Sequence, residues 1–279
     1  MGKKTWYITG ASRGFGRAWA TAALRRGDMV AAAVRDPSTV AVLVAEFGKA
    51  ILPVRLDVTN RAASFEALEA ARAHFGRVDV VVNNAGYGHF GFVEELSEAD
   101  ARAQLETNFF GALWTTQAAI PLFRAQGGGH LLQVSSVGGV VAFPNLSIYH
   151  ASKWALEGLT EALAAEVAMF GIRTTLIEPG GFATDWAGPS ARRSTPLPQY
   201  QPIRDAMAAQ ATGMRLPGPE DTVAALLSIV DVAEPPARVL LGSFAQDLAV
   251  HRTEQRIAEW KRWDVVARSA DGSAERQKP

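Results

Sequence analysis

Tyr149 and Lys153, four residues apart in the stretch YHASK, are side chains that could carry acid–base chemistry. Reduction of a ketone needs a proton donor for the oxygen as hydride reaches the carbon. A phenol has a pKa of about 10, far from neutral pH. If both residues lie on one helix face, the lysine ammonium stands one turn away and lowers the phenol pKa. On these two residues alone, an exposed helix pair without chemistry explains the spacing equally well.

Two further polar residues precede this pair. Ser136 follows a short apolar run, thirteen residues before Tyr149, where its hydroxyl could hold a substrate oxygen beside the phenol. Alternation along a strand would point the neighbouring Ser135 elsewhere. Asn108 lies inside a helix-like stretch, TNFFG, although asparagine is a poor helix former. A capped or solvent-facing asparagine is the alternative for Asn108 considered alone.

The elements that must position these residues follow from the apolar pattern. Short runs rich in Val and Ile are apolar throughout, as expected of strands covered on both faces, and they alternate with longer helix-like stretches. Strand, helix, strand in series implies right-handed crossovers and a parallel sheet. We predict an α/β fold: a Rossmann-type, doubly wound parallel sheet of about seven strands with helices on both faces, in three α/β/α layers. The predicted strands are residues 6–9, 29–34, 51–56, 78–83, 130–135, 173–178 and 238–242, and the predicted helices residues 16–26, 61–75, 98–123 and 149–170.

A glycine-rich loop, TGASRGFG, follows the first predicted strand. Its glycines at 10, 14 and 16 allow a tight turn and close approach to a pyrophosphate, whose charge suits the N-terminus of the next helix. The G-x-G-x-x-G fingerprint is absent because Trp19 stands at its third glycine. A Walker A motif is absent because Phe15 stands where it requires glycine. A glycine-rich turn without a ligand is the alternative for this loop by itself.

Three motifs occur together: T-G-x-x-x-G-x-G near the start, N-N-A-G at 83–86 and Y-x-x-x-K at 149–153. Their order and intervals resemble the short-chain dehydrogenase/reductase family over about residues 5–245. The glycine spacing is similar to the single-domain members, and the stretches YITGASRGFGR and EPGGFATDW are similar to bacterial oxidoreductases near the hydroxysteroid and retinol dehydrogenases. The resemblance implies that the asparagine bends its helix and holds a water that links the lysine to solvent. The implied catalytic set is Asn108, Ser136, Tyr149 and Lys153, with Lys153 also bonded to the nicotinamide ribose.

The resemblance implies a nicotinamide dinucleotide, and two arginines favour its phosphorylated form. The family usually places an acid at the position of Val34, where it would bind the ribose hydroxyls of NAD. Arg13 and Arg35 suit a 2′-phosphate, which a guanidinium can grip bidentately. We expect NADP(H). NAD(H) is the alternative if both arginines are solvated, and Asp36 weakens the positive field.

Further cofactor contacts are implied at the ends of other strands. Asp57 and Val58 correspond to the adenine position, although an aspartate that begins a turn is the alternative. The turn at 179–184 would hold the nicotinamide carboxamide through the backbone at Phe182 and the hydroxyl of Thr184. The predicted cofactor set is Gly10, Ser12, Arg13, Gly14, Phe15, Gly16, Arg35, Asp57, Val58, Asn84, Ala85, Gly86, Tyr149, Lys153, Pro179, Gly180, Phe182 and Thr184.

Aromatic and apolar residues cluster in the segments where a substrate would lie. Pockets for small apolar molecules are lined this way, although core packing explains any one of these residues, and the histidine among them is also explained as an ordinary loop residue. The cluster indicates a fairly bulky, apolar ketone or secondary alcohol. The predicted substrate contacts are Ser136, Tyr149, His89, Phe143 and Trp186, and Tyr87 and Phe90 belong to the same cluster.

We predict one dinucleotide-binding and catalytic domain over residues 1–279, with a proline-rich substrate lid at about 185–219 and a C-terminal helix at about 243–267. In the lid, Arg192 and Arg193 could meet an anionic acyl-carrier or CoA arm; we interpret them as a solvated pair. The expected activity is an NADP(H)-dependent carbonyl reductase or hydroxysteroid-dehydrogenase-like enzyme that interconverts a ketone or aldehyde and an alcohol. The alternatives are a 3-oxoacyl-thioester reductase, an epimerase or dehydratase, and a non-catalytic NADP-binding sensor.

The amino-acid composition limits the kinds of partner that we expect for this protein. Lys plus Arg number 28 and Asp plus Glu number 28, a balance that argues against nucleic acid. No cysteine occurs, and the five histidines show no metal-ligand spacing, so we expect no metal. No apolar run approaches the length of a membrane span and no signal peptide fits before the first strand, so we expect a cytoplasmic protein away from membranes. The amphipathic tail is either a cover for its own domain or a subunit contact, and we expect a homodimer or homotetramer.

Overall fold

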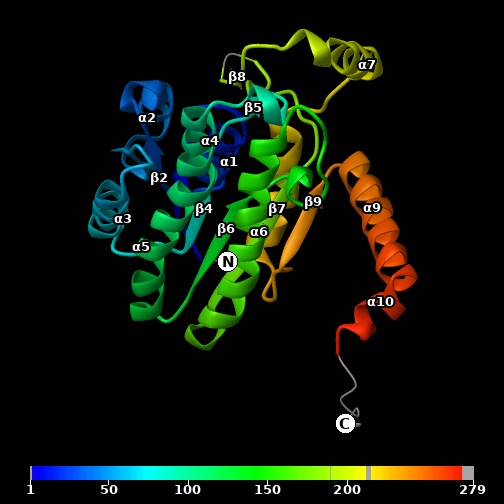
Figure 1. Cartoon of the computed structure of the whole chain (residues 1–279). Helices are drawn as coiled ribbons and strands as arrows, with labels where there is room; N and C mark the ends of the chain where they lie inside the picture. The colour runs from blue at the N-terminus through cyan, green and yellow to red at the C-terminus, as the bar shows by residue number, and fades with distance from the viewer. Residues whose placement is uncertain (1, 189, 212–214, 272–279) are drawn as a thin grey trace.

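The computed structural model of the chain describes residues 2–188, 190–211 and 215–271. At its centre lies a seven-stranded sheet in the order β3-β2-β1-β4-β6-β7-β9, parallel throughout (Figure 1). The order reverses between β1 and β4, which is the topological switch point of a doubly wound sheet. The strands are β1 (Thr5–Thr9), β2 (Met29–Val34), β3 (Ile51–Arg55), β4 (Val80–Asn83), β6 (Gly129–Val134), β7 (Ile172–Pro179) and β9 (Arg238–Leu241).

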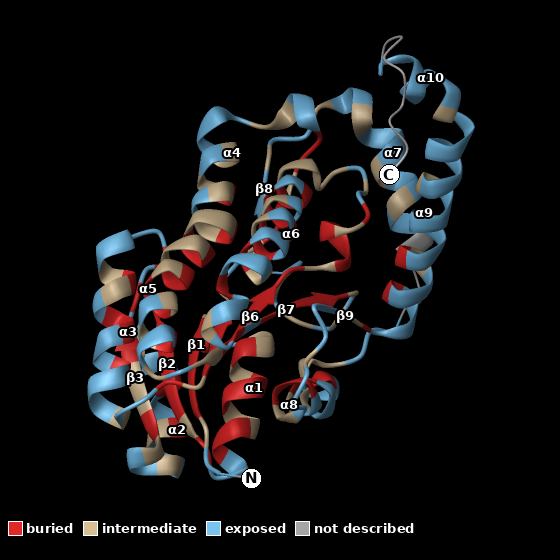
Figure 2. Ribbon diagram, turned by 90° about the horizontal axis from the view of Figure 1, so that it is seen from below, coloured by how far each residue is buried: buried red, intermediate tan, exposed pale blue. Residues whose placement is uncertain are grey.

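Helices cover both faces of this sheet, and buried residues concentrate in the strands and on the inward helix faces (Figure 2). Trp6 and Ile8 point to one face and Tyr7 to the other, so one strand feeds two cores. The predicted three-layer α/β/α fold is therefore confirmed. One face carries α1 (Gly14–Arg25), α2 (Ala41–Phe47) and α8 (Val223–Asp231), and the other carries α3 (Arg61–Phe75), α5 (Gly111–Ala125) and α6 (Ser147–Val167).

Two details of the helices differ from the prediction. The stretch 98–123 is not one regular helix: α4 (Glu98–Leu105), capped by the hydroxyl of Ser97, continues through a π-helical turn, η4 (Glu106–Phe110), into α5. Helices α2 and α8 were not predicted, because both are short and mostly apolar and so resemble strands in sequence. Short 3₁₀ turns lie at η1 (Pro37–Val40), η2 (Gly48–Ala50), η3 (Val93–Glu95), η5 (Val137–Gly139), η6 (Ala168–Phe170), η7 (Pro198–Tyr200) and η8 (Pro219–Thr222).

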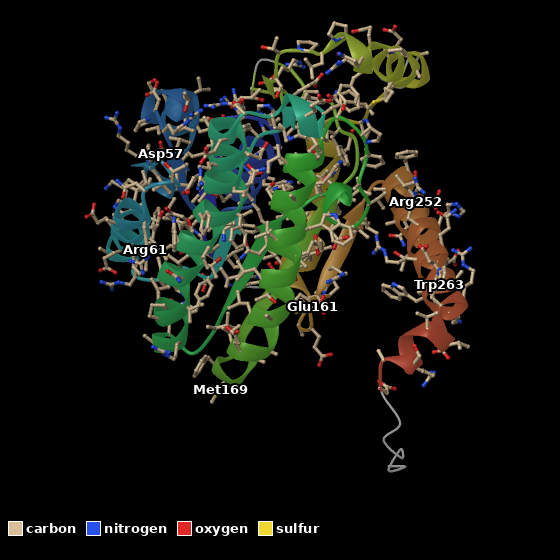
Figure 3. All side chains as sticks on the ribbon, in the orientation of Figure 1. Asp57, Arg61, Glu161, Met169, Arg252 and Trp263 are labelled. Carbon is tan, nitrogen blue, oxygen red and sulfur yellow. The ribbon has the colours of Figure 1, made fainter. Side chains whose placement is uncertain are left out.

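The predicted lid and tail form structure of their own. In the lid, β8 (Arg192–Arg193) pairs with β5 (His89–Phe90) apart from the main sheet, and α7 (Gln201–Ala211) follows; Pro189 and residues 212–214 lie outside the described residues. The tail is two helices rather than one, α9 (Ser243–Arg262) and α10 (Asp264–Ser269), with Trp263 at their junction (Figure 3). Ala245 and Ala249 of α9 are buried against the body of the protein. Across the described ranges, no helix has the length and apolar character to span a membrane.

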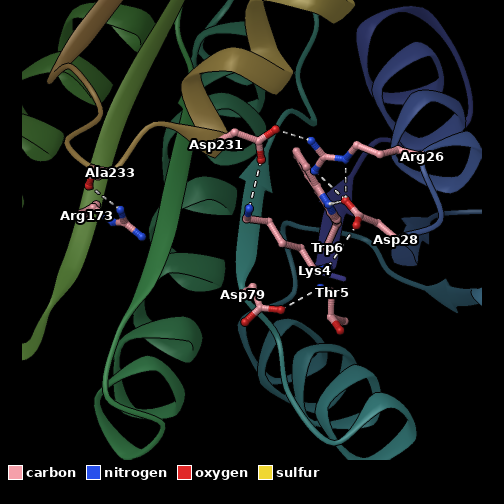
Figure 4. Close-up of polar contacts among 9 residues, drawn as sticks. All are labelled: Lys4, Thr5, Trp6, Arg26, Asp28, Asp79, Arg173, Asp231 and Ala233. Carbon is pink, nitrogen blue, oxygen red and sulfur yellow. Dashed lines mark hydrogen bonds and ion pairs between the residues drawn. The ribbon is translucent and has the colours of Figure 1, made fainter. Parts of the chain in front are cut away.

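At the amino edge of the sheet, charged side chains form a closed network (Figure 4). Asp28, almost fully buried, accepts hydrogen bonds from the indole Nε1 of Trp6 at 2.8 Å and from Nε of Arg26 at 3.0 Å. Asp231 pairs with Lys4 at 3.0 Å and with Arg26 at 2.7 Å. These contacts join β1, α1 and α8 at the edge opposite the glycine loop.

Candidate active site

A cleft of about 1010 Å³ lies at the carboxyl edge of the sheet, where the loops after β1, β2, β3, β4, β6 and β7 converge. This is the edge at which doubly wound sheets bind ligands. The structure brings almost the whole predicted set of residues to this one cleft. Three predicted residues do not line it: Gly16, His89 and Asn108.

The glycine loop is bound directly to the turn after β4. Asn84 donates from Nδ2 to the backbone oxygens of Thr9 at 2.9 Å and Gly10 at 3.2 Å. Gly10 has φ +68°, and a Cβ there would lie 3.0 Å from Cα of Ala85. A Cβ on Gly16 would lie 2.4 Å from the Gly10 oxygen, so Gly16 acts by letting α1 pack against the loop. The two motifs therefore form one unit.

The N-terminus of α1 lies at the cleft, and among the described residues no side chain caps it. Its N-cap residue, Arg13, makes no side-chain cap hydrogen bond, and no acidic residue lies in the first turn. The first N–H groups of a helix lack intrahelical acceptors and carry a partial positive charge. Gly14 faces Thr184, whose Cβ would lie 3.7 Å from a Cβ on the glycine. These features fit a pyrophosphate group held between the glycine loop and the turn after β7.

Aromatic packing surrounds Trp19, the residue that departs from the common fingerprint. Trp19, which replaces a glycine of the common fingerprint, stacks on Phe15 with ring centroids 5.2 Å apart and donates from Nε1 to the hydroxyl of Thr222 at 2.8 Å. Phe182 meets Phe15 edge to face at 5.3 Å. The three rings join the glycine loop, η8 and the turn after β7 into one rigid wall.

Arg13 and Arg35 both line the cleft and are exposed to solvent. Asp36, which was expected to weaken their positive field, does not line the cleft. Its carboxylate accepts from the backbone N–H of Ser38 at 3.0 Å and caps η1, and hydrogen bonds from Ser38 lower its pKa. Both arginines therefore line the cleft while the neighbouring carboxylate caps a local turn.

Tyr149 and Lys153 lie on α6 with their polar ends in the cleft. The helix begins at Ser147, two residues before the tyrosine, and places Nζ of Lys153 5.9 Å from the centre of the phenol ring. Nζ also donates to the backbone oxygen of Val134 at 2.7 Å. Burial lowers the pKa of Lys153 to about 8, while the charge of Glu157 opposes that shift.

The expected lowering of the Tyr149 pKa by Lys153 is not found in this structure. Burial raises the pKa of Tyr149 to about 12, and a hydrogen bond with Ser136 offsets only part of that shift. Burial is the largest cause of the shift because the side chain is almost fully enclosed. Tyr149 is therefore a neutral phenol that holds its proton at the cleft.

Ser136 stands beside the tyrosine, as the spacing predicted. Its hydroxyl accepts from the backbone N–H of Gly138 at 3.0 Å and lines the cleft. The Ser135 hydroxyl is directed toward Glu157, since both would crowd a Cβ placed on Gly139, at 2.5 and 2.9 Å. The alternation that favoured Ser136 over Ser135 thus agrees with the structure.

Asn108 sits in the π turn and supports the cleft from behind. Its Nδ2 donates to the backbone oxygen of Tyr87 at 3.0 Å and to the Ser152 hydroxyl at 3.1 Å, and its Oδ1 accepts from the Tyr87 N–H at 3.1 Å. A Cβ on Gly86 would lie 3.1 Å from Asn108 Oδ1 and 3.8 Å from Nζ of Lys153. The asparagine thus reaches the lysine side of the site while it fixes the backbone after β4.

Between Tyr149 and Lys153, the side chains of His150 and Ser152 support the site. His150 is buried; its Nδ1 bonds the Gly138 oxygen at 2.9 Å, and its Nε2 accepts from the Phe143 N–H at 3.0 Å. Ser152 links Asn108 to α6. No spacing signal distinguishes such residues, because their partners lie outside the YHASK stretch.

The substrate end of the cleft is aromatic. Trp186 meets Tyr149 with ring centroids 4.9 Å apart, and Phe143 lies beside it in the lining. His89 is 1% exposed, and its Nε2 is hydrogen-bonded to the hydroxyl of Ser194 at 2.8 Å, outside the cleft. Burial lowers the pKa of His89. Of the predicted aromatic contacts, Phe143 and Trp186 reach the cleft, whereas His89 joins β5 to the lid.

Comparison with known proteins agrees with this site. The sequence matches the family model described as short chain dehydrogenase over residues 4–194. The chain belongs to the short-chain dehydrogenase family, as its motifs suggested, and is an oxidoreductase of that family. The protein named Oxidoreductase BOA17 from Botryotinia fuckeliana is 41% identical over 264 residues, covering 93% of this chain and 96% of that protein.

Solved structures show the same likeness. A short-chain dehydrogenase from Streptomyces avermitilis superposes with a TM-score of 0.89 at 36% identity, covering 96% of this chain and 99% of that chain. A relative from Burkholderia phymatum in complex with NAD gives a TM-score of 0.80 at 27% identity, covering 92% and 95% of the two chains. Another, from Burkholderia cenocepacia, was solved in complex with NADP. The family binds nicotinamide cofactors of both kinds.

Proposed function

We propose that this protein is an NADP(H)-dependent oxidoreductase that interconverts a ketone or aldehyde and an alcohol, with a fairly bulky, apolar substrate. The observation that carries the proposal is the convergence of Ser136, Tyr149 and Lys153 with the glycine loop in one cleft. When bound, the nicotinamide supplies the hydride. Trp186 and Phe143 provide apolar surface for the rest of the substrate.

The chain's own residues manage the proton. Tyr149, kept neutral by burial, donates its proton to the carbonyl oxygen while Ser136 holds that oxygen beside the phenol. The charge of Lys153 then stabilises the phenolate that remains. Asn108 holds the backbone at Tyr87 and stands next to the lysine, where it can position a water that returns the proton. Lys153 also lies where it can hydrogen-bond the nicotinamide ribose.

The cofactor preference rests on Arg13 and Arg35, which both line the cleft. Val34 offers no carboxylate to the ribose hydroxyls of NAD, and Asp36 is used as a cap. A 2′-phosphate would meet two cations there, which favours NADP(H) over NAD(H).

A 3-oxoacyl-thioester reductase is the second candidate, since the same catalytic residues would serve it. In the lid at 185–219, Asp185, Trp186 and Arg192 line the substrate end of the cleft, which suits a cover over the bound substrate.

We further propose that the chain forms one catalytic domain and that it assembles as a homodimer or homotetramer in the cytoplasm. The ground for the assembly is that Trp260, on α9, and Trp263, just after it, are exposed. Light scattering in solution measures the subunit number.

The test of this function is a panel of ketones and alcohols assayed in parallel with NADPH and NADH. We expect turnover of bulky apolar ketones with NADPH and at least tenfold lower kcat/KM with NADH, since a charge-assisted contact contributes about 1.5–3 kcal/mol. Activity confined to acetoacetyl-CoA would support the thioester reductase instead. A preference for NADH would contradict the assignment of Arg13 and Arg35, and no turnover of any carbonyl compound would contradict the proposed activity.

A further inference from the structure

Arg192 and Arg193, interpreted from sequence as one solvated pair, have different surroundings in the structure. Arg193 donates from Nη2 to the backbone oxygen of Ala187 at 2.6 Å, and its guanidinium lies 5.0 Å from the centre of the Phe90 ring. Arg192 lines the cleft, 5.3 Å from the centre of the Tyr87 ring. Successive side chains on a strand point to opposite sides, and β8 therefore gives only Arg192 to the cleft.

The guanidinium of Arg192 keeps its hydrogen-bond donors free. Within the part of the chain that the structure describes, no acceptor lies within hydrogen-bonding distance of its side chain, and no carboxylate lies within 4.0 Å. Asp185 and Glu106 line the same cleft, yet neither forms an ion pair with it. By contrast, Arg204 in the same lid is paired with the buried carboxylate of Glu95.

The position of Arg192 is fixed on both sides. Its backbone N–H donates to the oxygen of Gly88 at 2.9 Å, and that of Ser194 donates to the oxygen of Phe90 at 2.9 Å, which holds β8 against β5. Its aromatic platform, Tyr87, is held through its own backbone by Asn108 and by Gln104. A cation held in this way binds a partner with less loss of conformational freedom than a mobile loop arginine.

We propose that Arg192 binds an anionic group of the substrate while the carbonyl lies at Tyr149. The inference rests on the proposed function and narrows its substrate class to amphipathic carbonyl compounds. Trp186 packs edge to face against Tyr149 at 4.9 Å and lines the cleft. An apolar segment of the substrate would therefore lie between its carbonyl, at Tyr149, and its anionic group, at Arg192. A guanidinium grips carboxylate or phosphate oxygens bidentately, and both groups fit this site.

Matched pairs of substrates test the inference. One arm compares aryl ketones that carry a carboxylate on alkyl chains of increasing length with their methyl esters. The other compares acetoacetyl-CoA, whose anions are phosphates, with the uncharged acetoacetyl-N-acetylcysteamine. We expect the wild type to prefer the anionic member of at least one series by roughly tenfold or more in kcat/KM, as one charge-assisted contact allows.

Two variants assign that preference to a residue. Arg192→Gln should lower the anionic-to-neutral ratio of kcat/KM by roughly tenfold, and Arg192→Lys should retain part of it. Arg193→Gln, the neighbouring control outside the cleft, should leave the ratio unchanged. Melting temperatures confirm that each variant is folded.

The outcomes distinguish a failure of the role of Arg192 from a failure of the proposed oxidoreductase activity. A wild-type ratio near one in every pair, or an unchanged ratio in Arg192→Gln, overturns the inference, while turnover of the neutral ketones still supports the proposed function. Absence of turnover for every compound overturns both. A preference in the carboxylate arm alone supports a small keto acid, and one in the CoA arm alone supports a carrier thioester.

Discussion

At the amino edge of the sheet, Asp28 meets three donors of its own chain, whereas at the carboxyl edge Tyr149 and Lys153 are buried with few such partners. Desolvation raises the pKa of Tyr149 and lowers that of Lys153 at the carboxyl edge. Both edges are equally part of the fold. What differs is whether polar groups are satisfied within the chain or left for a ligand.

This difference teaches how one sheet serves two purposes. Paired charges at the amino edge fix β1 against α1 and α8 and stabilise the native state (Figure 4). Unpaired or desolvated groups at the carboxyl edge cost stability unless something binds to them. Substitutions at the carboxyl edge should therefore raise stability and lower activity, whereas those at the amino edge should lower stability and leave activity unchanged.

The largest effect is expected for Lys153→Met. Loss of the cation that stabilises the phenolate should lower kcat by about 10²–10⁴-fold. The same change should raise the free energy of unfolding of the nucleotide-free protein at pH 7 by about 2 kcal/mol, because charging a buried lysine whose pKa is about 8 costs stability. Steady-state kinetics and urea unfolding measure the two effects.

The pH dependence of that stability difference is its control. The unfolded chain keeps the lysine protonated up to its ordinary pKa of about 10.5, whereas the folded chain releases the proton near pH 8. Wild-type stability therefore gains relative to Lys153→Met as the pH rises from 8 to 10.5, and the difference shrinks. A variant less stable than the wild type at pH 7 would contradict the account.

At the amino edge, Asp28→Ala should have the opposite signature. It removes a buried carboxylate and leaves the Trp6 indole and Arg26 without that acceptor, at a cost of about 3 kcal/mol in the free energy of unfolding. The kcat of the folded protein should not change. Asp231→Ala is the matched control: it pairs with the same arginine at a more exposed position, and should cost about 1 kcal/mol or less. Equal losses of unfolding free energy in the two variants would contradict the distinction between the buried and the more exposed carboxylate.

The cofactor end of the carboxyl edge is tested by Arg35→Gln. Removal of one of two guanidinium groups should weaken NADPH binding by roughly 10–100-fold and change NADH binding little, because NADH lacks the 2′-phosphate. Arg25→Gln serves as a control, since that arginine is exposed in the last turn of α1 and does not line the cleft. Fluorescence titration of both nucleotides provides the constants.

The smallest effect is expected at a buried carboxyl pair behind the site. Desolvation and mutual repulsion raise the pKa of Glu178, and desolvation raises that of Glu157. The folded chain thus holds protons that the unfolded chain releases above pH 4.5, so stability falls as the pH rises toward 8. In Glu178→Gln, the free energy of unfolding should fall less steeply as the pH rises. Glu161→Gln, at an exposed partner of Arg238 on α6 (Figure 3), should leave it unchanged.

The sequence predicted the elements that periodicity and motif spacing encode. All seven sheet strands were located to within two residues at each end, and the order of motifs placed Ser136, Tyr149 and Lys153 in one site. The π turn at Asn108 and the short helices α2 and α8 were missed, because neither a change of helix type nor a short apolar helix has a distinct sequence period.

Other features depend on contacts between distant segments. His89 was grouped with the substrate residues by its place in the chain, yet the pairing of β5 with β8 turns it toward Ser194. The same pairing places Arg192 in the lining of the cleft, whereas Arg193, which lies outside that lining, bonds the backbone oxygen of Ala187. The raised pKa of Tyr149 reflects the burial that several loops create together, which the spacing to Lys153 cannot reveal.

The most direct test of the central claim is Tyr149→Phe, assayed with a reducible ketone and NADPH. If Tyr149 donates the proton, kcat should fall by about 10²–10⁴-fold. NADPH affinity should remain within about threefold of wild type, since the variant loses one hydroxyl and keeps the glycine loop and both arginines. A variant that binds NADPH normally and turns over near the wild-type rate would show that the proton comes from another group.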